Sequence, residues 1–323
     1  MLIQLRYNWF VSKTFVLIDS HALIYRAFHA FPDLTAPDGT LVNAVYGFSR
    51  SLLTAIRDLK PTYIAATFDS KGKTKRAEEY VEYKANRAAM PDELIPQIAL
   101  VRDVVTALNI PQFSQSGIEA DDLLGTITRQ VEQEHPEVRS IIVTGDKDMF
   151  QLVSERTRVW LPGRGRGSLD TEYDAAAVEQ YMGVSVSQII DLKALMGDAS
   201  DNIPGVKGVG PKTAIKLLKK HHSLQGIYER LDQLIAGEQP AADEVLVGSV
   251  FKKMQLDRDM AFLSQKLATI DRSVAIDFLL EPCRVSSYDK AAASELFETL
   301  GFKSLKGLLP KDEFEIGVQN ALF

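Results

Sequence analysis

The residues best suited to chemistry are aspartates that directly follow short apolar runs. Asp146 and Asp148 come just after the apolar run 141–143, and Asp19 and Asp69 each follow an earlier apolar run. Because such runs favour buried parallel strands, whose carboxyl ends meet at one sheet edge, these side chains should share one acidic pocket. Crowded carboxylates repel one another unless cations lie between them. The pattern therefore predicts a site for hard divalent cations.

The composition is that of a globular protein with room for one large domain or two ordinary ones. The chain has 323 residues, 46% of them hydrophobic and 25% charged. Its net charge of −6 argues only weakly against a nucleic-acid partner, because metal-binding carboxylates would bias the total. The single cysteine, Cys283, excludes an intramolecular disulfide and a thiol metal cluster and is expected to be a packing residue. We find neither a signal peptide nor a membrane span, residues 1–14 included, which predicts a cytoplasmic protein without membrane contact.

The first half of the chain alternates apolar runs with helical periodicity. Such alternation predicts an α/β fold with a mainly parallel sheet flanked by helices. The predicted strands are 15–18, 63–68, 110–115 and 141–143, with a hairpin over 156–170. The predicted helices are 20–29, 43–59, 94–108, 117–131 and 174–182, with a further helix beginning at 149.

A basic and aromatic segment spans residues 70–92. Lys84 and Arg87 alternate there with glutamates, and Tyr80 and Tyr83 are interleaved. One interpretation is a solvated loop or exposed helix. The other is a cover over the acidic pocket that binds phosphates and stacks a base. The local pattern leaves both open.

A further acidic group, Glu119 with Asp121 and Asp122, opens the predicted helix 117–131. The helix dipole favours acidic residues in a first turn, which explains the group structurally. Glu119 and Asp122 are also three residues apart and can face the same way, as shared ligands would.

The chain becomes helical from Val184 onward and contains a glycine-rich turn at 203–214. Gly205, Gly208 and Gly210 predict a helix-hairpin-helix whose backbone amides point outward and bind a DNA phosphate. An ordinary helical hairpin would need one glycine rather than three. Lysines cluster here, with no acidic residue between Asp201 and Glu229. Beyond Leu224 we expect helices and short strands, including 267–276, and no catalytic constellation.

Together these motifs make the chain resemble the 5′-nuclease (5′→3′ exonuclease) domain of bacterial DNA polymerase I, within the flap endonuclease family. The resemblance runs from about Phe15 to Leu309. Its most specific parts are Glu-Ala-Asp-Asp at 119–122, Thr-Gly-Asp-Lys-Asp at 144–148, the stretch 197–210 and Tyr-Lys-Ala-Asn-Arg at 83–87. After Leu309 the chain has no room for a polymerase domain, so we expect a free-standing nuclease or a fragment.

The resemblance implies a nuclease core of the PIN and flap-endonuclease type over 1–183, with an arch segment at about 70–92. It implies a helical, DNA-binding part over 184–323. The implied metal ligands are Asp19, Asp69, Glu119, Asp121, Asp122, Asp146, Asp148, Asp198 and Asp201. The implied basic residues near the scissile phosphate are Arg26, Arg76, Lys84 and Arg87. The expected DNA-binding residues are Tyr80, Tyr83, Gly205, Lys207, Gly208, Gly210, Lys212, Thr213 and Lys216.

The implied activity is metal-dependent 5′→3′ exonuclease and 5′-flap endonuclease cleavage of DNA in replication, as primer removal, and in repair. Two to three Mg²⁺ or Mn²⁺ ions are the expected cofactors, and the hairpin can hold K⁺. The expected partner is 5′-flap, nicked or 5′-ended duplex DNA at the bacterial nucleoid, and a DNA polymerase partner is left open. Two alternatives remain. One is a PIN-like ribonuclease, which would lack the hairpin at 203–214, and the other is a non-catalytic helix-hairpin-helix scaffold, which has no need of the carboxylates.

Overall fold

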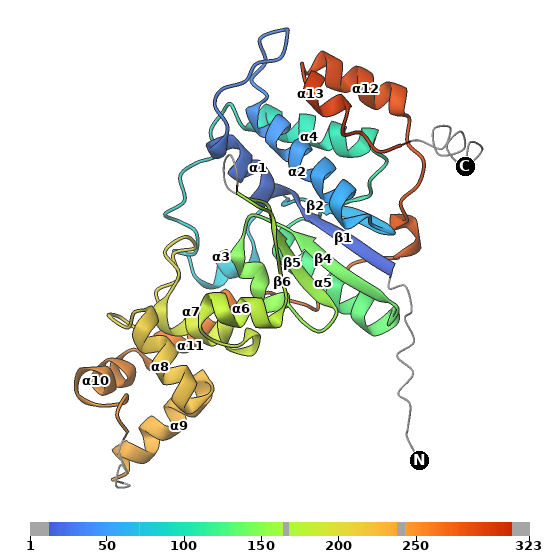
Figure 1. Cartoon of the computed structure of the whole chain (residues 1–323). Helices are drawn as coiled ribbons and strands as arrows, with labels where there is room; N and C mark the ends of the chain where they lie inside the picture. Colours follow the sequence, from blue (N-terminus) through green and yellow to red (C-terminus); the bar gives the residue numbers. More distant parts are fainter. Residues whose placement is uncertain (1–12, 71, 164–167, 238–242, 312–323) are drawn as a thin grey trace, which may run out of the picture.

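The computed structural model describes residues 13–70, 72–163, 168–237 and 243–311 (Figure 1). Its centre is a 6-stranded sheet in the order β3-β2-β1-β4-β5-β6. The strands are β1 (Lys13–Asp19), β2 (Tyr63–Thr67), β3 (Gln112–Phe113), β4 (Val138–Val143), β5 (Thr157–Leu161) and β6 (Thr171–Tyr173). All neighbours pair in parallel except β5 and β6, so the expectation of a mainly parallel sheet is confirmed.

The antiparallel pair β5 and β6 corresponds to the predicted hairpin at 156–170. Val159 pairs with Tyr173 and Leu161 with Thr171, so the returning strand begins just beyond the predicted range. The hairpin tip at 164–167, with its predicted turn arginines, lies outside the described residues.

Side chains of the central strand β1 alternate between two hydrophobic cores, because successive residues of a strand point to opposite faces. Val16 and Ile18 belong to one core, and Phe15 and Leu17 to the other. The first core is covered by α1 (Ser20–Ala30), α2 (Asn43–Leu59), α4 (Ile95–Ala107), α12 (Lys290–Thr299) and α13 (Lys303–Lys306). The second lies under α5 (Ala120–Glu134) and continues into the helical part of the chain (Figure 1).

The helical part forms an extension beside the sheet, with α8, α9 and α10 furthest from it (Figure 1). Its helices are α6 (Ala175–Met182), α7 (Ile189–Met196), α8 (Pro211–His221), α9 (Leu224–Ile235), α10 (Gly248–Leu256) and α11 (Arg258–Ala268). The short elements are α3 (Lys75–Glu79) and the 3-10 helices η1 (Lys147–Leu152), η2 (Val186–Gln188) and η3 (Glu281–Cys283). Cys283 is buried, as expected of a packing residue.

Two local predictions differ from the structure. The predicted helix from residue 149 is the 3-10 helix η1, which begins at Lys147 because Asp146 caps it by accepting from the Asp148 amide at 2.9 Å. The expected strand at 267–276 is not one. Side chains take the backbone groups that a neighbouring strand would need, since Thr126 Oγ1 accepts from the Val274 amide at 3.1 Å and Gln151 from the Ile270 amide at 3.0 Å.

Within the described residues, none of the helices combines the length and the apolar character that crossing a membrane requires.

Candidate active site

The site begins where β1 and β4, adjacent parallel strands, reach their carboxyl ends. The strand order reverses between these two strands, and such a switch point opens a crevice in α/β sheets. Asp19 ends β1 and caps α1, since its Oδ1 accepts from the Ala22 amide at 3.3 Å. Its Oδ2 accepts from Thr144 Oγ1 at 2.6 Å. Burial raises the pKa of Asp19 to about 6 despite these hydrogen bonds.

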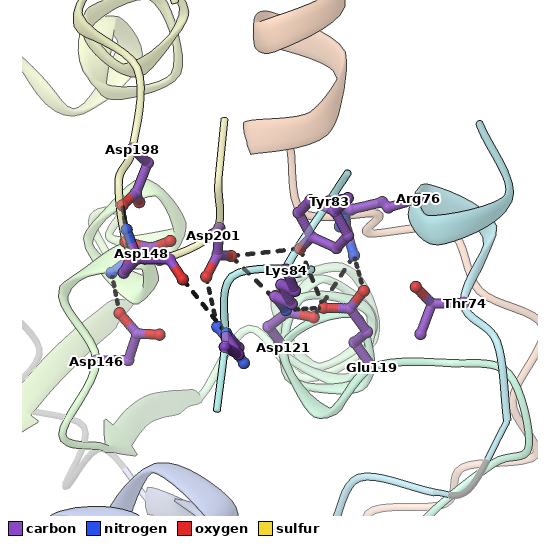
Figure 2. Close-up of polar contacts among 12 residues, drawn as sticks. Thr74, Arg76, Tyr83, Lys84, Glu119, Asp121, Asp146, Asp148, Asp198 and Asp201 are labelled. Atoms are coloured by element: carbon purple, nitrogen blue, oxygen red, sulfur yellow. Dashed lines mark hydrogen bonds and ion pairs between the residues drawn. The ribbon is translucent and has the colours of Figure 1, made fainter. Parts of the chain in front are cut away.

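A lysine that the sequence analysis did not single out holds the next group of carboxylates. Lys193, on the buried face of α7, pairs with Asp148 and donates to Asp198 Oδ2 at 2.6 Å. Burial would raise the pKa of Asp198, but Lys193 and Ser200 outweigh it and lower this pKa to about 2. Asp146 lies beside the pair (Figure 2). Loss of hydration and the charge of Asp148 raise its pKa to about 7.

A second group of carboxylates opens α5. Arg76 lies 2.5 Å from Asp122 Oδ1, 3.4 Å from Glu119 Oε1 and 3.9 Å from Asp121 Oδ1. Asp122 also accepts from the Asp271 amide at 2.8 Å, so it faces the 269–271 loop. Burial raises the pKa of both Asp121 and Asp122. The same factor acts on Glu119, but Lys84 and Arg76 outweigh it and lower its pKa.

Asp69 joins the edge from the end of β2. Its Oδ1 accepts from the Ala120 amide at 2.8 Å, which connects β2 to the start of α5. The Asp69 amide donates to His21 Nδ1 at 3.0 Å, and His21 is a second contact that sequence analysis did not single out.

Within the predicted arch segment of about 70–92, residues 80–87, called the arch from here on, lie directly on the acidic groups (Figure 2). Lys84 Nζ pairs with Glu119 and lies 3.6 Å from Asp201 Oδ2. Tyr83 is 5% exposed, and its hydroxyl is 3.3 Å from both Glu119 Oε2 and Asp201 Oδ2. Arg87 pairs with Asp201. In this arrangement the Tyr83 ring is covered, so stacking on a base would require the arch to move.

The other two predicted site residues of this region lie nearer its edges. Arg26 donates to the carbonyl of Gly163 at 2.5 Å and also to Pro162 O, at the start of the β5–β6 loop. Tyr80 is half-buried and donates to Glu82 at 3.0 Å. Their expected roles toward DNA stay predictions.

The acidic side chains are brought together but are separated by basic ones. Among the described residues, no three acidic, histidine or cysteine side chains converge as one ion's ligands, because Lys193, Lys84 and Arg76 lie between them. Oxygen donors with reduced hydration nevertheless suit a hard divalent cation. The buried Glu119 Oε1 accepts no hydrogen bond from any described residue. The donor set therefore fits Mg²⁺ or Mn²⁺.

The predicted hairpin at 203–214 forms the turn between α7 and α8. Gly205 has φ +65°, and a Cβ there would lie 2.2 Å from the Gly197 amide nitrogen, so the position requires glycine. The Gly205 amide donates to Ser264 Oγ at 3.0 Å and the Lys207 amide to Asp257 Oδ2 at 2.8 Å. The Gly205 amide thus points inward rather than outward as expected, whereas the Lys207 amide makes its hydrogen bond at the surface. Gly208, with φ +76°, and Gly210 are exposed, as are Lys207, Lys212 and Lys216, whereas Thr213 is half-buried.

Only a weak sequence signal pointed to Lys193. It is the one basic residue of a mainly apolar helix, 189–196, which also contains Asp191, and it lies five positions before Asp198. A lysine on a buried helix face needs a partner, so the nearby aspartate could have suggested the pair. His21 carried no comparable signal, because its contact with Asp69 depends on the pairing of β1 with β2.

Two family models match adjoining parts of this chain. Residues 14–183 match the 5′-3′ exonuclease N-terminal resolvase-like domain, and residues 184–291 match the 5′-3′ exonuclease C-terminal SAM fold. The chain belongs to the 5′-3′ exonuclease family. Relatives include DNA polymerase I of Chloroflexus aurantiacus, 41% identical over 92% of this chain, and DNA polymerase I of Bacillus subtilis, 36% identical over 94%. The chain spans 30% and 33% of these relatives.

Solved structures share the fold at low sequence identity. T5 5′-exonuclease with bound divalent metal ions (zinc) has a TM-score of 0.62 and 19% identity, over 92% of this chain and 97% of that one. The catalytic core of Rad2 in complex with a DNA substrate has a TM-score of 0.60 and 16% identity, over 93% and 94%. The resemblance to the nuclease domain of bacterial DNA polymerase I, in the 5′-3′ exonuclease family, is confirmed, and the protein is a nuclease of this family.

Proposed function

We propose that the chain is a structure-specific 5′→3′ exonuclease and 5′-flap endonuclease that hydrolyses DNA phosphodiesters with two divalent metal ions. The observation that carries the proposal is the acidic edge at the ends of β1 and β4, in a chain of the 5′-3′ exonuclease family. The solved relatives contain divalent ions or a DNA substrate, which supports the same partners here.

The residues proposed to hold the metal ions are the acidic ones at this edge. They are Asp19, Asp69, Glu119, Asp121, Asp122, Asp146, Asp148, Asp198 and Asp201. When bound, Mg²⁺ or Mn²⁺ would supply Lewis-acid stabilisation of charge on the phosphate. Among the proposed ligands Asp122 is the most constrained, because Arg76 and the Asp271 amide already occupy its two oxygens.

Lys84 and Arg87 are proposed to bind the non-bridging oxygens of the scissile phosphate. Both already reach the acidic edge from the arch, so a phosphate that displaced their carboxylate partners would meet two cations. Arg76 and Arg26 are proposed to stabilise the negative charge of the same phosphate from the edges of the site. The arch would also keep bulk water away from the phosphate.

The hairpin at 203–214 is proposed to hold duplex DNA by its backbone. Lys207, Lys212 and Lys216 are exposed on and beside it, and phosphate contacts of this kind carry no sequence information. Recognition would then follow the structure of the DNA. The proposal also includes a potassium ion at the hairpin and a role in primer removal and repair at the bacterial nucleoid. It further includes a polymerase that works beside this chain or is joined to it.

The test is cleavage of 5′-flap, nicked and single-stranded DNA, and of a matched RNA, with Mg²⁺ and with excess EDTA. We expect cleavage of the structured DNA in Mg²⁺ and none in EDTA. Cleavage in EDTA would refute the metal mechanism. Preference for RNA would favour the ribonuclease alternative, and binding without cleavage in Mg²⁺ would favour the scaffold.

A further inference from the structure

Two asparagine side chains fasten the arch segment (80–87) to the loop 198–202 that follows α7. Asn86 Nδ2 donates to the Ala199 carbonyl at 2.7 Å. Asn202 Nδ2 donates in the opposite direction, to the Glu82 carbonyl, at 2.6 Å. Each segment therefore supplies one amide donor and one carbonyl acceptor to the other. We name this reciprocal pair of hydrogen bonds the amide clasp.

The backbone between the two asparagines adds a third connection. The Lys84 amide donates to the Asp201 carbonyl at 2.9 Å. Lys84 has φ +57° and Asn202 has φ +55°, both in the left-handed region. Asparagine adopts this region readily, whereas a lysine needs surrounding contacts to keep it there. The clasp lies on both sides of Lys84 and supplies such contacts.

Besides the clasp, the tip of the arch is held by the ion pairs of Lys84 and Arg87 and by one buried ring. Val81, Glu82, Ala85 and Arg87 are exposed, and Tyr83 is the one residue of this segment buried in an apolar cluster, beside Ile203 and Leu267. The clasp hydrogen bonds are themselves exposed. Losing them should therefore loosen the arch without unfolding either core.

The clasp connects the two sets of charges that the proposed reaction needs. The arch carries Lys84 and Arg87, and the loop carries Asp198 and Asp201, which are proposed metal ligands. Fixing one segment against the other sets where the cations of the arch stand relative to the acidic edge. A displacement of about 1 Å in such an arrangement can cost a large part of the rate.

We propose that Asn86 and Asn202 are positioning residues of the nuclease, acting through Lys84 and Arg87 rather than by touching the substrate. This inference rests on the proposed function and adds residues that are not among the expected metal ligands, basic residues or DNA-binding residues. It predicts a defect in the rate of the bound complex, because the hairpin and not the clasp holds the duplex.

The experiment compares Asn86→Ala, Asn86→Gln and Asn202→Gly in the full chain. Asn109→Gly is the matched control, because Asn109 also has φ +55° and donates to a distant loop, at Ser286 and Ser287. We expect Asn86→Ala and Asn202→Gly to lower the single-turnover rate at saturating flap DNA about 10-fold or more. The Kd in Ca²⁺ should change less than about 3-fold, since few contacts to DNA are lost. Asn86→Gln, which keeps the donor, should recover part of the rate, and Asn109→Gly should behave like wild type.

A double-mutant cycle separates positioning from general loosening. On a Lys84→Ala background, Asn86→Ala should have little further effect on the rate, because the group that it positions is gone. Full additivity would overturn the proposal, as would an unchanged rate in Asn86→Ala and Asn202→Gly. A faster rate in these variants would show that the clasp closes the site, and that result would also overturn the positioning role.

Hydrogen exchange at the Lys84 amide reports the clasp independently of activity. Exchange should accelerate in Asn86→Ala and Asn202→Gly but not in Asn109→Gly. Unchanged exchange would overturn the clasp itself. An inactive wild type would refute the proposed function and with it the positioning role, whereas an active wild type with unaffected clasp variants would refute the clasp alone.

Discussion

Basic partners decide how the single carboxylates of the site behave. Asp198 and Glu119 have cations at short range, and their pKa values are lowered in spite of burial. Asp19 and Asp146 lack an equally close cation, and their pKa values rise to about 6 and about 7. An additional positive charge is therefore needed at the carboxyl ends of β1 and β4, where the proposed ions would bind, and also at Asp121, whose pKa burial raises in spite of Arg76.

Asp146→Asn should abolish cleavage and leave the fold intact. Asp146 lies at the molecular surface, where neighbouring groups reduce its hydration without making it part of a core, so the substitution removes no core packing and relieves repulsion from Asp148. We expect the cleavage rate in Mg²⁺ to fall about 10²-fold or more. The Tm without metal should stay unchanged or rise. Asp103→Asn, an exposed carboxylate on α4, is the charge-matched control and should change neither quantity. A clear drop in Tm for Asp146→Asn would mean that the carboxylate has a structural role.

Most of the acidic residues could be predicted from local pattern, because they lie at a strand end or in a first helical turn, whereas Asp198 and Asp201, in the loop after α7, were implied only by the family resemblance. Asp19 follows an apolar run and Glu119 opens a helix, so neither required knowledge of the packing. Lys193 and the amide clasp were not predictable in the same way. Their partners lie on other elements, and only the packing of α7 beside η1 and of the arch on loop 198–202 brings them together.

At the scale of elements, periodicity located most helices, and side-chain caps explain where several begin. α2 spans Asn43–Leu59 as predicted, and α6 begins after Asp174, whose carboxylate accepts from the Ala177 amide at 2.9 Å. The stretch 267–276 shows the limit of the method. Its alternation is typical of a strand, but residues of α5 and η1 bind its backbone, a competition that is invisible in the sequence.

The helical part depends on a buried carboxylate, Asp243. It lies 3.2 Å from Lys220 Nζ, 3.2 Å from His221 Nε2 and 3.9 Å from Arg230 Nε. It also accepts from the Leu246 amide at 2.9 Å. Asp243→Ala should lower the free energy of unfolding of the full chain by about 1–3 kcal/mol, because it leaves buried donors unpaired. Denaturant titration at pH 7 measures this loss. Truncation of Asp232, whose pair with Arg258 is exposed, should have no measurable effect.

The loss in Asp243→Ala should depend on pH in one direction. Burial alone would raise the pKa of Asp243, but its hydrogen bonds to Leu246, Val245 and Lys220 outweigh burial and lower it. A carboxylate whose pKa is lowered in the folded state stabilises that state to its full extent at pH values above the pKa of the unfolded chain, about 4. That stabilisation is lost as the pH falls through the lower folded-state pKa. The difference in stability between wild type and variant should therefore begin to shrink below about pH 4 and keep shrinking as the pH falls through the folded-state pKa. The same pH series on a His221→Gln background removes the second group that titrates in this cluster. A stability difference that stayed constant down to acid pH would contradict the lowered pKa of Asp243.

At the scale of the whole molecule, two parts meet at the acidic edge. The sheet part supplies Asp19 and Asp146, while the helical part supplies Lys193 and Asp198 from α7 and the loop after it. Two exposed lysines of the hairpin region, Lys212 and Lys216, belong to α8, one of the helices of the extension that lies away from the sheet (Figure 1). This division predicts that chemistry and duplex binding can be impaired separately.

Lys84→Ala and Lys212→Ala should show opposite defects. Lys84 stands over the carboxylates and would meet the phosphate mainly as charge develops, so its loss should lower the single-turnover rate about 10²-fold or more. Duplex affinity should change little, because the hairpin is proposed to supply most phosphate contacts. Lys212→Ala should weaken binding equally on different sequences, with a near-normal rate at saturating DNA. The salt dependence of its binding should flatten by up to about one unit of log–log slope.

The measurements are Kd in Ca²⁺ over a salt series and single-turnover rates in Mg²⁺. If Lys84→Ala lost affinity but kept its rate at saturating DNA, the arch would be a binding surface only. An unchanged salt slope for Lys212→Ala would show that this lysine is part of a solvated helix face.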